Sequence, residues 1–147
     1  MIRPYTQKDY SGILTIYHQS KLDELRYEKN TFTLLPLNKD SRRLQQLLDS
    51  DIYVYEEEQQ VIAYAALCDA EIRALFVEPN SRGKGVGRKL LTFLLERAPQ
   101  STTLNIAKSN IPAKKLYEQY NFKVIKEFKT DYNGITVSAN TMKRNIP

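Results

Sequence analysis

Apolar residues recur along this chain with two periods, which predict alternating helices and strands. Spacings of three and four residues predict helices over 9–20 and 41–48, and a third over 86–98 with one apolar stripe of Val86, Leu90, Leu91, Leu94 and Ala98. Runs rich in β-branched and aromatic residues predict strands over 2–5, 52–55, 61–68, 71–77 and 102–107. The segment 21–38 fits neither pattern, because charged residues and a proline interrupt its leucines.

Capping residues mark the ends of the helices. Asp40 is placed to cap the helix over 41–48, and Ser109 or Asn110 to cap a further helix with Pro112 in its first turn. Asn121 stands where that last helix needs a left-handed terminator.

The C-terminal part reads as a β-hairpin. Asn133-Gly134 predicts a tight turn between strands over 122–131 and 135–142. Because the chain has no repeat, low-complexity tract or evident linker, we expect all 147 residues to form one domain, 1–147.

Composition excludes several classes. The hydrophobic content of 41% and charged content of 27% are ordinary for a soluble globular protein. No apolar stretch approaches the roughly 20 residues that cross a bilayer, and no export signal is visible, so we expect a cytoplasmic protein without a membrane partner. Cys68 alone excludes an internal disulfide, and with a single histidine, His18, it argues against a metal site.

A glycine-rich run lies between the strand 71–77 and the helix 86–98. Arg82-Gly83-Lys84-Gly85-Val86-Gly87 leaves the backbone bare, and Arg82, Lys84 and Arg88 surround it with positive charge. The following helix turns its unpaired N–H groups and positive dipole end toward this loop. Together these features indicate an anion site, most plausibly for a pyrophosphate.

The net charge of +5 admits two explanations, a polyanionic cofactor or a nucleic acid. The clustered charge coincides with the glycine loop, which favours the cofactor. A nucleic-acid-binding domain remains the alternative and predicts steeply salt-dependent binding.

Two motifs in this order resemble the GNAT superfamily of acetyl-CoA-dependent N-acetyltransferases. The first is the run that begins at Arg82, which corresponds to the family pattern Arg/Gln-x-x-Gly-x-Gly/Ala. The second runs from Asn110 through Ala113, Leu116 and Tyr117 to Phe122, with Asn121 in place of the family's glycine. The resemblance implies an α+β GNAT fold: a mixed, mostly antiparallel sheet of six to seven strands flanked by about four helices, splayed open between the strands 71–77 and 102–107.

The resemblance also implies acetyl-CoA as the co-substrate. Its pantetheine arm would pair with the strand backbone at Leu75, Phe76 and Val77, and Asn110 would hydrogen-bond the arm from the opposite side. Loop N–H groups from residue 82 to 88 would hold the pyrophosphate. The expected cofactor-binding set is Leu75, Phe76, Val77, Arg82, Gly83, Lys84, Gly85, Val86, Gly87, Arg88, Asn110 and Tyr117.

Transfer of acetyl from a thioester to an amine needs an acid and a base. Tyr117 is the candidate acid, because the matching tyrosine of the family points at the cofactor sulfur; a core aromatic is the compatible structural reading. Glu71 is the candidate base. Strand alternation places Glu71, Arg73 and Leu75 on one face and Ile72, Ala74 and Phe76 on the other. Two alternatives remain: Glu71 could only form an ion pair with a neighbouring residue, or a chain of waters could take the proton in place of Glu71.

The acceptor side is expected in the segment 21–38. Glu24, Tyr27 and Phe32 would suit a cationic amine by charge and cation–π contact, and Arg73 could bind a substrate carboxylate. An ordinary solvated helix face is the alternative.

The predicted function is N-acetylation of a primary amine of a small molecule or peptide, by direct attack in a ternary complex. Acylation of a protein lysine or N-terminus, and a non-catalytic acetyl-CoA-binding module, remain alternatives. The ten tyrosines leave a homodimer open.

Overall fold

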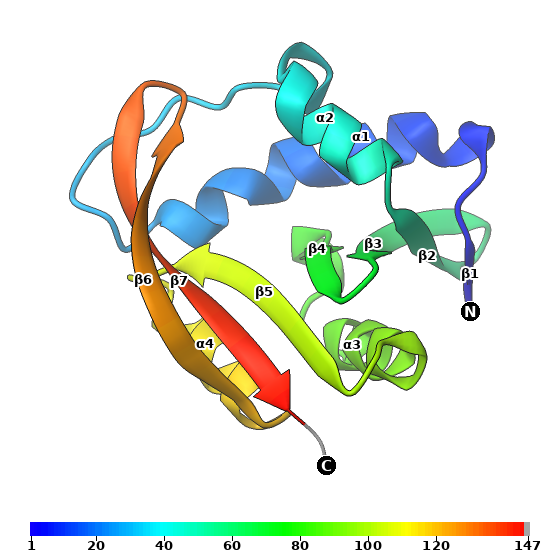
Figure 1. The fold of residues 1–147 in the computed structure, drawn as a ribbon. Helices are drawn as coiled ribbons and strands as arrows, with labels where there is room; N and C mark the ends of the chain where they lie inside the picture. The colour runs from blue at the N-terminus through cyan, green and yellow to red at the C-terminus, as the bar shows by residue number, and fades with distance from the viewer. Residues whose placement is uncertain (146–147) are drawn as a thin grey trace.

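The computed structural model describes residues 1–145, and a seven-stranded sheet forms its centre (Figure 1). The elements are β1 (Ile2–Pro4), α1 (Tyr10–Ser20), α2 (Ser41–Leu48), β2 (Asp51–Glu57), β3 (Gln60–Cys68), β4 (Glu71–Val77), α3 (Val86–Arg97), β5 (Ser101–Ala107), α4 (Ile111–Glu118), β6 (Phe122–Tyr132) and β7 (Ile135–Asn145). Four 3-10 turns within these residues are η1 (Gln7–Asp9), η2 (Lys21–Leu25), η3 (Leu37–Lys39) and η4 (Pro79–Ser81).

The sheet is mixed and mostly antiparallel, which confirms the predicted fold class. Its strand order is β1-β2-β3-β4-β5-β7-β6, and every neighbouring pair is antiparallel except β4 with β5. These two strands pair only at Glu71 with Thr103 and at Ile72 with Leu104. Beyond that point they diverge, so that β5, β7 and β6 form a half of the sheet that turns away from β4 (Figure 1).

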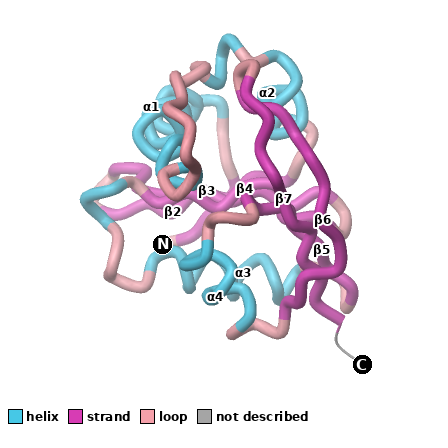
Figure 2. Tube along the Cα trace, turned by 90° about the vertical axis from the view of Figure 1, so that its left-hand side faces the viewer, coloured by secondary structure: helices cyan, strands magenta, loops and turns pink. Residues whose placement is uncertain are grey.

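Helices cover both faces of the sheet. Figure 2 shows α1 and α2 on one side of the strands and α3 and α4 on the other. The apolar stripe of α3 is the most deeply buried, with Leu90, Leu91 and Leu94 at 0% exposure. A second cluster joins Ile13 and Ile16 of α1 to the opposite face of β2–β4. The two cores hold β4 between them and fix its position at the split.

The predicted caps are confirmed. The Asp40 side chain accepts a hydrogen bond from the Arg43 backbone, and Asn110 caps α4. Asn121 has φ 72°, and Asn133 and Gly134 have φ 49° and 89°, as a left-handed terminator and a type I′ turn require.

The predicted alternation along β4 is wrong at one residue. Ala74 pairs with Ala66 and Ile72 with Leu67, so Arg73 is an extra residue without a partner on β3. This β-bulge reverses the facing of the strand on either side of it. Ile72 therefore packs into the core under α3, whereas Ala74 and Phe76 belong to the core under α1.

None of the helices within residues 1–145 is long and apolar enough to cross a membrane. In the same residues, no three or more His, Cys, Asp or Glu side chains gather as a metal site would require.

Candidate functional site

A cavity of about 640 Å³ occupies the split between β4 and β5. Its walls come from α1, η2, α2, β4, β5 and α4, so segments distant in sequence meet there. Among its lining residues are ten of the predicted site residues: Glu24, Glu71, Arg73, Leu75, Phe76, Val77, Arg82, Gly87, Asn110 and Tyr117.

The backbone of β4 supplies one wall. Leu75, Phe76 and Val77 pair with β3 on one edge, while their other edge lies beyond the last pair with β5. An unpaired strand edge presents N–H and C=O groups that an extended ligand can use. The Val77 carbonyl accepts hydrogen bonds from Arg82 Nε at 3.1 Å and Ser20 Oγ at 3.4 Å.

The glycine loop stands at the start of α3. Gly83 and Gly85 have φ 79° and 82°, a conformation that favours glycine, and Gly85 is the N-cap of the helix. Gly87 lines the cavity, and a Cβ placed there would lie 3.6 Å from Val77 Cγ2. The bare backbone and the helix N-terminus therefore adjoin the open edge of β4.

Not every predicted loop residue reaches the cavity. Arg82 and Gly87 line it, whereas Gly83, Lys84, Gly85, Val86 and Arg88 are not among its lining residues. Val86 is a core residue at 4% exposure, and the side chains of Lys84 and Arg88 are exposed. A role for these five in holding a diphosphate stays a prediction that rests on their backbone N–H groups or exposed charges.

Tyr117 and Asn110 form the opposite wall. The Asn110 side chain caps α4 by accepting from the Ala113 N–H at 3.5 Å, and the Tyr117 ring packs edge-on against Phe122 at 5.7 Å. Burial raises the pKa of Tyr117 well above its ordinary value, and the Glu24 carboxylate adds to the rise. The Tyr117 hydroxyl consequently keeps its proton throughout the neutral and mildly alkaline range.

Glu71 and Arg73 form an ion pair with each other. Arg73 Nε lies 2.8 Å from Glu71 Oε1, and Arg73 Nη1 donates to the Gln46 carbonyl at 3.0 Å. The bulge makes this possible, because it turns Arg73 toward α2. Both side chains line the cavity, but each already has a partner.

Two residues predicted for the acceptor side lie elsewhere. Tyr27 is 49% exposed and lies 5.3 Å from the Arg26 guanidinium, and Phe32 packs on Tyr132 with ring centroids 6.3 Å apart. Neither lines the cavity. Both residues follow the end of η2 at Leu25, and the chain leaves the wall of the cavity after Arg26.

Several lining residues of the cavity were not predicted from the sequence. Tyr17 and Tyr64 line it, and the Tyr17 hydroxyl is buried without a hydrogen-bond partner among the described residues. Both stand at apolar positions typical of core residues, so no local sequence signal set their hydroxyl groups apart from those of core aromatics. Lys21 and Arg43 also line it, together with a second cavity of about 320 Å³ toward β6 and β7.

The Glu24 carboxylate lies close to both cavities and to several buried tyrosines. It lines both cavities. In Tyr17, Tyr64, Tyr117 and Tyr132, burial is the main cause of a raised pKa, and the negative charge of Glu24 raises each pKa further. One negative charge thus acts on four tyrosines around the cavities.

The known proteins to which this chain is similar include acetyltransferases. The sequence profile of the acetyltransferase (GNAT) domain matches residues 49–124. The peptidyl-lysine N-acetyltransferase YjaB of Escherichia coli is 36% identical over 78 residues, which cover 53% of this chain and 52% of YjaB. The chain thus matches about half the length of this relative. The peptidyl-lysine N-acetyltransferase YiaC of the same species is 23% identical over 128 residues, covering 85% of this chain and 84% of YiaC.

Solved structures show the same fold. The structure of yncA, a proposed acetyltransferase from Salmonella typhimurium with its cofactor acetyl-CoA, superposes with a TM-score of 0.74. The sequences are 23% identical, and the alignment covers 100% of this chain and 94% of that one.

Proposed function

This chain belongs to the GNAT acetyltransferase domain family, and from that premise we propose that it transfers the acetyl group of acetyl-CoA to the side-chain amine of a lysine in a peptide. The observation that carries the proposal is the shared cavity, where the open edge of β4 faces Tyr117 and Asn110. The curated relatives named above, both peptidyl-lysine N-acetyltransferases, favour a peptide over a small molecule.

The residues fit acetyl-CoA in chemical terms. An extended pantetheine arm would pair with the unpaired backbone of Leu75–Val77, and Asn110 would contact it from α4. The N-terminus of α3, with Gly87 at the cavity wall and cationic Arg82 nearby, suits the diphosphate.

The transfer step requires a neutral amine. A lysine side chain has an ordinary pKa near 10.4 and arrives as an ammonium, so a base must take one proton before the nitrogen attacks the thioester carbonyl. The carbon–sulfur bond then breaks, and the leaving thiolate takes up a proton. Tyr117 is the proposed donor of that proton, because it lines the cavity opposite the open edge of β4 and a tyrosine hydroxyl carries its proton at neutral pH.

Glu24 is the proposed recognition group for the ammonium. It lines both cavities, and its cationic partner Lys21 lies at 3.2 Å, whereas Arg73 holds Glu71 more closely at 2.8 Å. Glu71 keeps its proposed role as the base only if its removal changes the pH dependence of the rate. A pH–rate profile of Glu71→Gln that coincides with that of the unchanged protein would remove Glu71 from the mechanism and leave a water chain.

The function is tested by thiol release from acetyl-CoA with matched acceptors. One peptide carries a single lysine and a blocked N-terminus, a second carries the lysine already acetylated and a free N-terminus, and small amines form the third group. We expect turnover with the first peptide alone. Turnover confined to small amines would overturn the peptide assignment, and coenzyme A binding without any turnover would indicate a non-catalytic module.

A further inference from the structure

Lys21 places a lysine ammonium inside the cavity. Its Nζ lies 3.2 Å from Glu24 Oε1, 5.4 Å from the centre of the Tyr132 ring and 5.9 Å from the centre of the Tyr17 ring, and its side chain is 14% exposed. A carboxylate and aromatic faces are the groups that recognise an ammonium. The chain's own lysine thus occupies the surroundings that an acceptor lysine needs.

The same cavity holds the groups expected around the thioester. Lys21 lines it together with Tyr117 and with Leu75, Phe76 and Val77 of β4. Glu24, the partner of Lys21, acts electrostatically on Tyr117. The amine of Lys21 and the proposed path of the acetyl donor therefore share one cavity.

Lys21 also lies where the two cavities meet. It lines the larger one at the split and the smaller one toward β6 and β7, as Glu24 and Arg43 do. A peptide lysine that entered through the smaller cavity would reach the position that the Lys21 ammonium now holds.

We propose that Lys21 is a self-acetylation site, modified within one molecule by the acetyl-CoA bound in its own cavity. This inference rests on the proposed function. The ammonium loses a proton to a base, Nζ attacks the thioester carbonyl carbon, the carbon–sulfur bond breaks, and coenzyme A leaves as the thiol with an amide left on Lys21. The products are N-acetyllysine, coenzyme A and one released proton.

The modification changes the acceptor site. An acetylated lysine carries no charge, so it cannot keep the ion pair with Glu24. The Glu24 carboxylate is then free for the ammonium of an incoming peptide. Self-acetylation thereby prepares the site for the external acceptor.

Mass spectrometry tests the proposal. The purified protein is incubated with acetyl-CoA alone, and acetylation is followed at Lys21 and at exposed Lys29 of the same segment. We expect Lys21 to react at least tenfold faster than Lys29, with a rate constant independent of protein concentration, and Tyr117→Phe to slow Lys21 by at least tenfold but leave Lys29 unchanged. In Lys21→Arg, which retains a cation for Glu24, the fast reaction should vanish.

The alternatives are separable. Equal rates at Lys21 and Lys29 indicate chemical acetylation and overturn the proposal, as does a rate constant that rises with protein concentration. If the lysine peptide is acetylated while Lys21 stays unmodified, this inference falls and the proposed function stands. If neither is modified and no thiol is released, the proposed function falls with it.

Discussion

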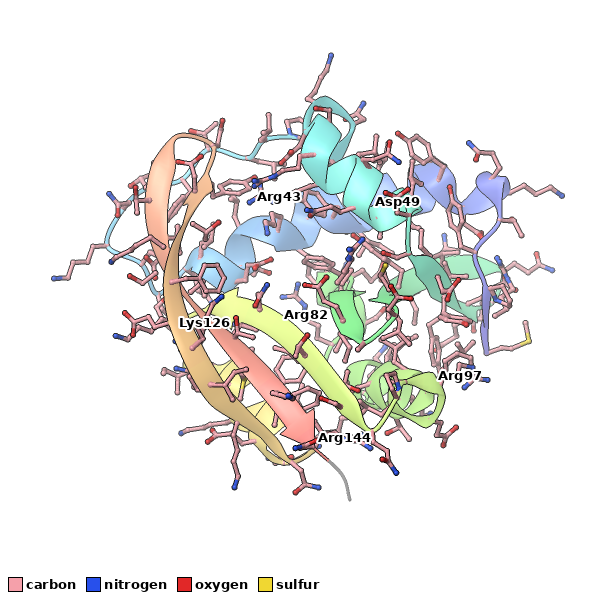
Figure 3. All side chains as sticks on the ribbon, in the orientation of Figure 1. Arg43, Asp49, Arg82, Arg97, Lys126 and Arg144 are labelled. Carbon is pink, nitrogen blue, oxygen red and sulfur yellow. The ribbon has the colours of Figure 1, made fainter. Side chains whose placement is uncertain are left out.

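Arg82 and Asp23 form an ion pair that links the glycine loop to η2, with Arg82 Nη1 2.7 Å from Asp23 Oδ2. The two residues are 59 positions apart in sequence. In Figure 3, Arg82 lies between β4 and β5. Its Nε also donates to the Val77 carbonyl, so the cation proposed for the diphosphate already has two partners.

The first prediction is that Asp23→Asn tightens coenzyme A binding. A ligand phosphate must draw Arg82 away from Asp23, and the pair is 37% and 41% exposed, so its strength is in the range of surface pairs. Surface pairs contribute about 0–1 kcal/mol, which corresponds to an affinity gain of about fivefold or less. Calorimetric titration with coenzyme A at low salt measures it.

The matched control for this variant is Glu28→Gln, which makes the same charge change in the same segment outside the cavity. It should leave the affinity unchanged. Weaker binding in Asp23→Asn would show that Asp23 orients Arg82 toward the ligand instead of competing with it.

The second prediction concerns Tyr117→Phe. The ring, which fills its place against Phe122, is retained, while the proposed proton donor is lost. Turnover at saturating substrate should fall by about 10²–10⁴-fold, with the coenzyme A dissociation constant little changed. Because burial raises the pKa of Tyr117, no loss of activity from its ionisation should occur up to the ordinary tyrosine pKa of about 10. A collapse of affinity with unchanged turnover would contradict the assignment.

Local signals were enough to predict most of the fold. The helix α3, the strand β4 and the hairpin turn at Asn133 follow from periodicity, caps and turn residues, all of which act over a few positions. The bulge at Arg73 could not be predicted in this way, since it depends on the register of β4 against β3. For the same reason, the sequence left two interpretations of Glu71, a catalytic base or a member of an ion pair.

The site was predicted unevenly. The wall formed by β4 and α4 carried motif residues, whereas the wall formed by α1 and β3 carries Tyr17 and Tyr64 at apolar positions typical of core residues. Nothing local distinguishes Tyr17, whose hydroxyl is buried, from an ordinary core aromatic. The contacts of Asp23 and Lys21 depend on how η2 folds against the split, and the segment 21–38 has no clear period.

The third prediction concerns stability at low pH. Arg3 holds Asp9 through two bonds of 2.8 Å, and hydrogen bonds from Arg3 lower the pKa of Asp9 from 3.8 to about 2. The carboxylate therefore stabilises the fold above its unfolded pKa, and this contribution is lost as the pH falls through about 2. Asp9→Asn should lower the free energy of unfolding by about 2 kcal/mol at neutral pH.

Urea unfolding at about pH 7, 4, 3 and 2 checks this prediction, since Asp9→Asn should flatten the loss of stability between about pH 4 and 2. Exposed Asp51 provides the control, because Asp51→Asn removes a carboxylate from the surface. An equal effect of both variants would mean that Arg3 gives Asp9 no special stability.

The last prediction separates the close approach of a ligand from backbone strain by comparing two glycines. At Gly87 an added Cβ would make an ordinary contact of 3.6 Å with Val77 Cγ2, and a helical alanine is favoured over glycine. Gly87→Ala should therefore fold at least as stably, yet its methyl group stands at the cavity wall and should weaken coenzyme A binding by about tenfold, or 1.4 kcal/mol. Gly134 has φ 89° in the β6–β7 turn, so Gly134→Ala should cost about 1–2 kcal/mol of stability and leave the affinity unchanged. Thermal unfolding and calorimetric titration of both variants give the four values. Unchanged coenzyme A affinity in Gly87→Ala would mean that the diphosphate does not approach the backbone at the start of α3.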